Sequence, residues 1–183
     1  MPSVPLTYVI GTVGMLFILG VVTLISVEFG LSLSGQATET SLNDAAQYVA
    51  SEIDTIAVTI SPSTPQTIAY HISMPKSFGY NGYAITLVSQ NGIWQVVAYS
   101  IQDPSISASV PLFFNGQNTS AGISVYVPQS SSSCPGPNCG IQISSYLKVY
   151  PSAQIYSGDN YAVVWANTTS QGGIYVGIGD LKP

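Results

Sequence analysis

The fold is decided by residues Pro5–Val27, PLTYVIGTVGMLFILGVVTLISV, an apolar run of about 23 residues without a charged side chain. As an α-helix this run measures roughly 34 Å, which is enough to cross the hydrocarbon core of a bilayer. A cleaved secretory signal is the alternative, but its apolar region spans only about 7–15 residues and follows a basic segment. The first basic residue here is Lys76. We therefore expect a membrane-length helix.

The chain beyond Glu28 turns amphipathic. No proline lies between Pro5 and Pro62, so the simplest prediction is one continuous helix of about 55 residues, some 80 Å long. Apolar residues in its second half recur at spacings of three and four, the period of one helical face. They are Leu42, Ala45, Ala46, Val49, Ile53, Ile56, Ala57 and Ile60.

A broken helix is the alternative to this continuous one. In that case Leu31–Gln36, LSLSGQ, is a flexible linker between a transmembrane anchor and an unrelated domain helix. Gly30 and Gly35 favour the break, since each costs about 1 kcal/mol in a helix interior. The continuous helix explains more, because its amphipathic stripe needs a partner and the chain downstream supplies one.

Beyond residues 61–65 the apolar pattern changes from helical to alternating, and short runs rich in β-formers continue to the end. Asn91-Gly92 favours a type I′ hairpin turn, because both residues tolerate positive φ. The expected strands are Thr67–Met74, Tyr83–Gln90, Ile93–Ser100, Ser105–Val110, Ile123–Val127, Ile141–Tyr150, Tyr161–Ala166 and Gly173–Ile178.

The fold class that follows is α+β. Residues 1–60 are expected to form the N-terminal hydrophobic helix and amphipathic spine. Residues 61–183 are expected to form an exported all-β sandwich domain of immunoglobulin-like type, with a partly open barrel as the alternative. We expect the amphipathic stripe to cover one open face of a sheet.

The charge composition excludes several classes of function. Only 6% of the 183 residues are charged, against roughly 25% in an average soluble protein. The basic residues are three lysines without an arginine, so no electrostatic footprint for nucleic acid exists. One histidine, His71, and two cysteines cannot complete a four-ligand zinc site. No nucleophile, base and orienting acid are arranged as catalysis requires, so we expect neither an enzyme nor a cofactor.

Two modification signals lie in the expected β domain. Cys134 and Cys139 flank the bend Pro-Gly-Pro-Asn, which favours an intramolecular disulfide, with free thiols as the alternative. Asn118 and Asn167 begin N-x-[ST] acceptor sequences between expected strands, so both are candidate glycosylation sites of an exported domain.

Taken together, a long uncharged N-terminal helix, an amphipathic spine and a β domain rich in Ser, Thr, Asn and Tyr resemble the archaeal type IV pilins. The resemblance covers the architecture of the whole chain, and its specific part is Pro5–Ile60. It implies an extracellular, cell-surface filament in which apolar helices bundle in the core and β domains form the outer surface, serving adhesion.

The resemblance also implies partners: a homopolymer through the N-terminal helices, the membrane before assembly, the pilus assembly machinery and a prepilin peptidase. Tyr8–Val27 would form the assembly core, where glycines allow close helix approach. The residues assigned to this core are Tyr8, Gly11, Gly14, Phe17, Ile18, Val21, Leu24 and Ile25.

The second interpretation is a membrane-anchored envelope protein, similar in architecture to the archaellum stator components that bind the surface layer. A third is an enzyme tethered by the helix, which needs a pocket with titratable residues that the sequence does not signal. Filaments in sheared cell-surface material would single out the pilin.

Overall fold

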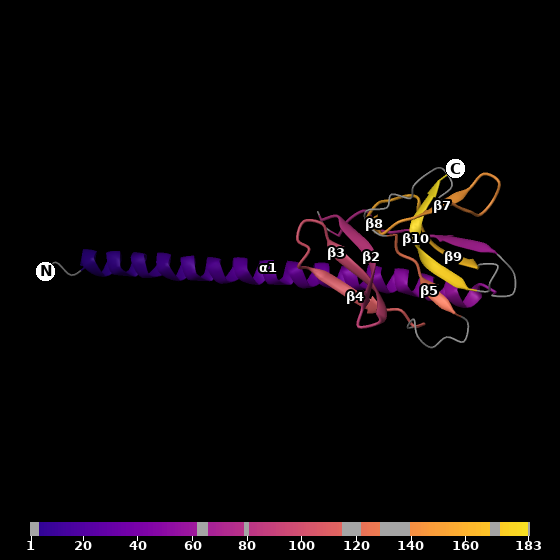
Figure 1. Ribbon diagram of the computed structural model, residues 1–183. Coiled ribbons are helices and arrows are strands. Elements are labelled where there is room, and N and C mark those ends of the chain that lie inside the picture. The colour runs from indigo at the N-terminus through magenta and orange to yellow at the C-terminus, as the bar shows by residue number, and fades with distance from the viewer. Residues whose placement is uncertain are drawn as a thin grey trace. The chain divides into compact units, whose positions relative to one another are not determined.

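The computed structural model describes residues 4–61, 66–78, 81–114, 122–128, 140–168 and 173–182. At residues 4–9, 31, 32 and 34 it describes the backbone alone. The chain divides into two compact units, Met1–Ala37 and Thr38–Pro183. The boundary between the units falls within a helix, between Ala37 and Thr38. The amphipathic half of the helix therefore belongs to the same unit as the strands (Figure 1).

One α-helix, α1, runs from Val4 to Thr59. Gly30 and Gly35 both lie within it, and the backbone of residues 31–36 is helical. The continuous helix is thus confirmed over its 56 residues, and the flexible linker is not realised. The helix continues through both glycines because a glycine keeps its backbone N–H and the hydrogen bond that it makes, whereas a proline has no N–H to donate.

The second half of α1 is part of the core of its unit. Leu42, Val49, Ile53 and Ile60 are all buried, as the stripe predicts. Ala45, Ala46, Ala50, Ile56 and Ala57 are buried beside them. Burial of each larger side chain contributes roughly 1.5–3 kcal/mol, so this segment is held by packing and not by helix propensity alone.

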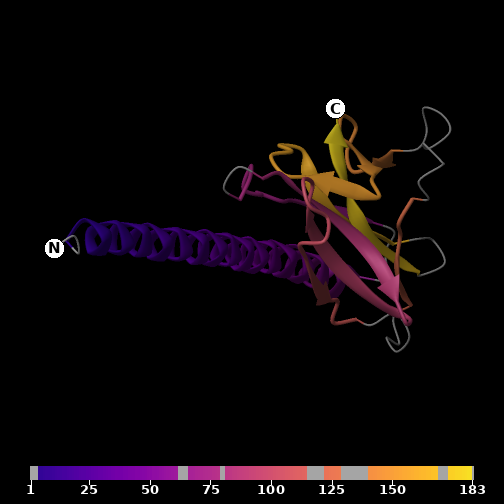
Figure 2. The ribbon, with the colours of Figure 1, turned by 90° about the vertical axis from the view of Figure 1, so that its left-hand side faces the viewer.

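The strands form two sheets (Figure 1, and turned by 90° in Figure 2). The larger has the order β1-β9-β10-β7-β6, with β5 paired to β10. Its strands are β1 (Thr67–His71), β5 (Ile123–Val125), β6 (Ile141–Gln142), β7 (Lys148–Pro151), β9 (Ala162–Thr168) and β10 (Ile174–Lys182). The smaller has the order β4-β3-β2-β8, made of β2 (Tyr83–Gln90), β3 (Ile93–Ser100), β4 (Ser107–Pro111) and β8 (Gln154–Tyr156). All pairings are antiparallel except that of β5 with β10.

Both sheets share one core with α1. Ile85 and Val96 from the smaller sheet, and Val164 and Val176 from the larger, belong to the same buried cluster as Ile53. The helix stripe therefore packs in a core to which two sheets contribute, and the expectation that it covers a single sheet face was too simple.

The Asn91-Gly92 hairpin is confirmed. Both residues have positive φ, 55° and 80°, and Gln90 pairs with Ile93 across the turn. Elsewhere the strands depart from expectation. Ile141–Tyr150 is interrupted between β6 and β7, where Ile143 N–H donates to the Leu147 carbonyl at 3.0 Å. The serines at 144 and 145 explain the interruption, since serine favours turns.

Candidate functional site

The apolar N-terminal part of α1 is the most unusual surface of the chain. Its large hydrophobic side chains from Ile10 to Val27 are between 40% and 74% exposed within the chain. Met15, Leu16, Phe17 and Ile18 follow one another at about 100° around the helix axis, so apolar side chains face every direction. A helix that is apolar all round is stable only inside lipid or among other protein segments.

The hydroxyl groups in this segment are compatible with such surroundings. Thr23 Oγ1 donates to the Leu19 carbonyl, and Ser26 Oγ donates to the Val22 carbonyl, each at 2.8 Å. Each hydroxyl is thereby satisfied within the helix itself. In an environment without water, an unsatisfied hydroxyl would cost several kcal/mol. The two hydroxyls therefore do not oppose burial of the segment.

The structure places the residues assigned to the assembly core as follows. Phe17, Ile18, Leu24 and Ile25 are strongly exposed, and Val21 is exposed to a smaller extent. Gly11 and Gly14 have no atom within 4 Å of a Cβ built on them, so their surfaces are open to a neighbouring helix. Tyr8 lies in α1, but its side chain is outside the described residues.

The first charged side chain of the sequence, Glu28, is exposed on α1, and the apolar residues Phe29 and Leu33 beyond it are exposed as well. No charged residue precedes it in the sequence. Beyond it, Glu39 and Asp44 are also exposed. Because burial of an unpaired carboxylate is costly, any apolar surroundings of the helix would end near Glu28.

This helix also meets the requirements for a membrane span. In the described part of the chain, Ile10–Thr59 is the one helix of sufficient length and hydropathy, with a mean hydropathy of 2.4 over 18 residues. A signal sequence near the N-terminus meets the same requirements. Length and composition are therefore compatible with membrane insertion without distinguishing these two roles.

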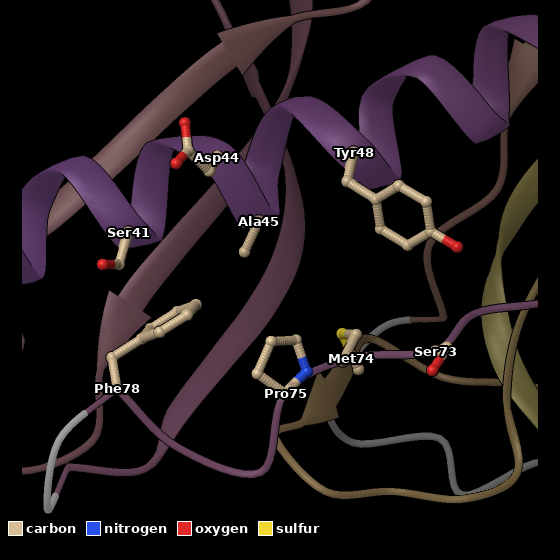
Figure 3. A pocket seen from close by; sticks show the side chains of 8 residues that line it. All are labelled: Ser41, Asp44, Ala45, Tyr48, Ser73, Met74, Pro75 and Phe78. Carbon is tan, nitrogen blue, oxygen red and sulfur yellow. The ribbon is translucent and has the colours of Figure 1, made fainter.

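The second unit carries a shallow cavity of about 280 Å³ beside α1 (Figure 3). Its walls are apolar for the most part, and polar groups lie at its margin. The lining residues are Ser41, Asp44, Ala45, Tyr48, Ser73, Met74, Pro75 and Phe78. Sequence analysis missed this feature, because residues 41–48 and 73–78 meet only after folding.

Tyr83 fixes the loop wall of this cavity. Its ring stacks on Phe78 with centroids 4.5 Å apart, and its hydroxyl donates to the Pro75 carbonyl at 3.0 Å. Burial raises the pKa of the Tyr83 hydroxyl to about 12, so it stays protonated and keeps donating. The cavity wall is therefore preorganised.

Two carboxyl groups of the second unit have a raised pKa. Burial raises the pKa of Asp180, and the neighbouring charge of Asp159 and a hydrogen bond with it raise that pKa further, while Lys182 lowers it. Burial also raises the pKa of Asp54. The Phe113 backbone N–H, which donates to the Asp54 carboxylate, lowers that pKa by a smaller amount. Neither carboxyl group lines the cavity.

His71 lies exposed on β1, and its Nε2 is 2.9 Å from the Asn160 carbonyl oxygen. A carbonyl only accepts, so Nε2 is the donor and its proton is engaged. Among the described residues, no three His, Cys, Asp or Glu side chains gather closely enough to hold a metal ion. His71 does not line the cavity.

The modification sites are only partly visible. Cys134, Cys139 and Asn118 lie outside the described residues. Asn167 is half-buried on β9 rather than between strands, and its Nδ2 donates to Thr67 Oγ1 at 2.7 Å. Thr168, the next residue of the acceptor sequence, is buried, and its hydroxyl donates to the Ser61 carbonyl at 3.3 Å. Glycosylation at Asn118 or Asn167, and the disulfide, stay predictions.

The chain matches no protein-family model, no curated protein and no solved structure.

Proposed function

We propose that the chain is a structural subunit of an extracellular helical filament of the archaeal type IV pilus kind, formed by its N-terminal helices. The observation that carries the proposal is the ring of exposed apolar side chains from Ile10 to Val27. These side chains face all directions, so a single partner surface does not cover them. Several neighbouring helices together can cover them.

The helix has two environments in this proposal. Before assembly it spans the membrane, where its satisfied Thr23 and Ser26 hydroxyls cost little. After assembly the helices of other subunits replace the lipid. At Gly11, Gly14 and Gly20 the space that a Cβ would take is open, which permits close approach of those helices.

The β region supplies the outer surface of the filament, exposed at the cell surface, and adhesion is its proposed role. We assign it to the immunoglobulin-like sandwiches, because two largely antiparallel sheets contribute to one core. Its departure from that class is the presence of α1 residues such as Ile53 in the same core.

The experiment is assembly of the purified full-length chain. The protein is solubilised in detergent, the detergent is removed by dialysis, and the product is viewed by negative-stain microscopy. Filaments are expected. Chains that only insert into added vesicles, without forming filaments, would instead fit the membrane-anchored envelope protein and contradict the proposal.

A matched pair of variants locates the contact. Ile18→Asp places a carboxylate where burial leaves it unpaired, at a cost of several kcal/mol per subunit, so filaments should not form. Val88→Asp adds the same charge at an exposed position of β2 and should leave filament yield unchanged. Equal yields from the two variants would show that Tyr8–Val27 does not hold the polymer.

A further inference from the structure

The smaller sheet has one face in the core and one face outside it. Ile85, Val96 and Ile155, from β2, β3 and β8, belong to the buried cluster. Because successive side chains of a strand point to opposite faces, the neighbours of these residues along each strand occupy the outer face. The register places two rows side by side in the middle of this face. They consist of Tyr99, Ala84 and Tyr156, and of Val97, Thr86 and Gln154.

Two tyrosines and a glutamine on this outer face form a hydrogen-bonded group. Tyr99 Oη donates to Gln154 Oε1 at 3.0 Å, and Gln154 Nε2 donates to Tyr156 Oη. The two bonds use the amide oxygen and one of its two N–H donors, so they fix the orientation of the amide. Tyr156 is 49% exposed and Tyr99 is half-buried. The group is therefore ordered and accessible at the same time.

The Tyr99 side chain lies across β2. Tyr99 belongs to β3 and Gln154 to β8, and β2 separates these two strands (Figure 1). About 9.5 Å therefore lies between the two backbones, and the hydroxyl reaches Gln154 only if the side chain runs along the sheet surface. Ala84, the partner of Tyr99 in β2, is completely buried and carries only a methyl group. The small residue leaves room for a phenol ring that turns one face outward.

This sheet carries no charge. None of the strands β2, β3, β4 and β8 contains a charged residue. A charged ligand would find no opposite charge on this face to attract it. An apolar partner would remove water from the Gln154 amide and the tyrosine hydroxyls without replacing their hydrogen bonds, which is costly. The chemistry of the face thus favours a ligand that is neutral and rich in hydroxyl groups.

Neutral carbohydrates have this chemistry. A pyranose ring carries C–H groups on its faces, and the negative face of an aromatic ring attracts their positive hydrogens. Its hydroxyl groups lie around the rim, where each both donates and accepts hydrogen bonds. A phenol ring that turns one face outward and an amide of fixed orientation meet both requirements.

We propose that the outer face of β3, β2 and β8 binds a neutral carbohydrate, with pyranose rings stacked on Tyr99 and Tyr156 and hydroxyl groups hydrogen-bonded to the Gln154 amide. This inference rests on the proposed adhesive role of the β region and names the class of ligand for that role. The hydrogen bonds within the group hold its side chains in place before the sugar arrives, so binding orders little further.

Nuclear magnetic resonance of the full-length chain tests the site. The chain carries ¹³C-labelled tyrosine rings and is kept in micelles of lauryldimethylamine oxide, because a maltoside detergent would itself present a sugar. Cellohexaose and maltohexaose are the neutral probes, and hexagalacturonate is the charged control. At least one neutral probe is expected to shift the ring signals of Tyr99 and Tyr156 in a saturable manner. Hexagalacturonate should shift neither.

Three variants locate the bound sugar. Tyr156→Ala removes a stacking ring and should weaken binding of the neutral probe about tenfold. Tyr156→Phe keeps the ring and should weaken binding by no more than about threefold. Tyr146→Ala is the matched control, because Tyr146 is 85% exposed in the loop between β6 and β7, and it should leave binding unchanged. Melting of each variant in the same micelles shows that the fold is kept.

Three results would overturn the carbohydrate site. The first is an absence of ring shifts with both neutral probes, and the second is equal binding of hexagalacturonate. The third is equal binding by Tyr156→Ala and the parent chain, because the sugar would then lie elsewhere.

The outcomes also separate this inference from the filament proposal, since the titration uses unassembled chains. Filaments formed by a chain that binds no neutral probe would leave the filament proposal intact and overturn the carbohydrate site. Binding by a chain that forms no filaments would support the site and contradict the filament alone. Equilibrium dialysis of the probe against formed filaments completes the test. Binding that disappears on assembly would show that another copy covers this face, and would overturn its role in adhesion.

Discussion

Trp165 Nε1 donates to the Ile178 carbonyl oxygen across β9 and β10 at 3.0 Å. The indole reaches this oxygen because Gly177 has no side chain. A Cβ there would lie 2.9 Å from Trp165 Cζ2 and 2.8 Å from the Tyr126 carbonyl oxygen. The Tyr126 ring also packs on the indole, with centroids 6.0 Å apart. Gly177 thus leaves room for the buried indole of Trp165 beside β10.

We predict that Gly177→Ala lowers the free energy of unfolding by about 1–3 kcal/mol, since the new methyl group displaces a backbone oxygen and a buried ring. Thermal melts of the full-length chain in detergent, followed by tryptophan fluorescence, measure the effect. Gly35→Ala is the control, because a Cβ there meets no atom within 4 Å and alanine favours the helix. A melting temperature of Gly177→Ala equal to that of the parent chain would contradict the packing.

Truncation of Ile53 tests the packing of α1 in the core. Ile53 is completely buried, so Ile53→Ala should cost about 2–5 kcal/mol, including the cavity that it leaves. Val58→Ala is the matched control on the same helix, because Val58 is strongly exposed, and it should change stability by less than about 0.5 kcal/mol. Similar denaturation midpoints for the two variants would show that the helix and the sheets are independent.

The stability of the second unit should depend on pH through Asp180 and Asp54. Burial raises the pKa of both groups in the folded state, and Asp159 raises that of Asp180 further. A raised folded-state pKa gives stability that is fully present below the unfolded-state value, about 3.9, and that is lost as pH rises through the folded-state value. Asp103 affects the pH dependence of stability in the opposite direction, because hydrogen bonds from Ser105 lower its pKa. Its contribution to stability is small, because it is exposed.

We therefore expect the melting temperature to fall as the pH rises above about 4. Asp180→Asn should weaken this dependence, whereas Glu39→Gln, at an exposed position of α1, should preserve it. The measurement is a series of melts between about pH 3 and 7 at constant ionic strength. A melting temperature that rises steadily over this range would contradict the assignment.

The disulfide prediction rests on the sequence around Cys134 and Cys139 alone. Freshly isolated protein should resist alkylation unless it is first reduced, and its intact mass should be about 2 Da below that of the reduced chain. A pair that alkylates fully without reduction would contradict an intramolecular bond.

The sequence predicted those features that depend on local pattern. The continuous α1, the buried stripe from Leu42 to Ile60 and the Asn91-Gly92 hairpin follow from helical period, the absence of proline and turn chemistry. Strand β8, Gln154–Tyr156, was missed because three residues do not establish a period. The break between β6 and β7 was missed because its serines lie within a β-rich run.

The exposed apolar surfaces were predictable to different degrees. The apolar helix is evident from composition, since no charge occurs before Glu28. The exposure of Phe113 was not predictable, because its backbone meets Asp54, 59 residues earlier in the chain, only after folding. The only sequence signal was the pair of phenylalanines at 113 and 114, and the pair does not reveal which ring is buried.

The central claim is that the apolar part of α1 is covered by the same part of other copies. Cryo-electron microscopy of filaments grown from the purified full-length chain tests it most directly. The account predicts that helices bundle along the filament axis, with Phe17 and Ile18 in van der Waals contact with neighbouring helices and Glu28 at the edge of the apolar core. Filaments in which residues 10–27 contact only solvent or lipid, with the subunits joined solely through their β regions, would contradict it.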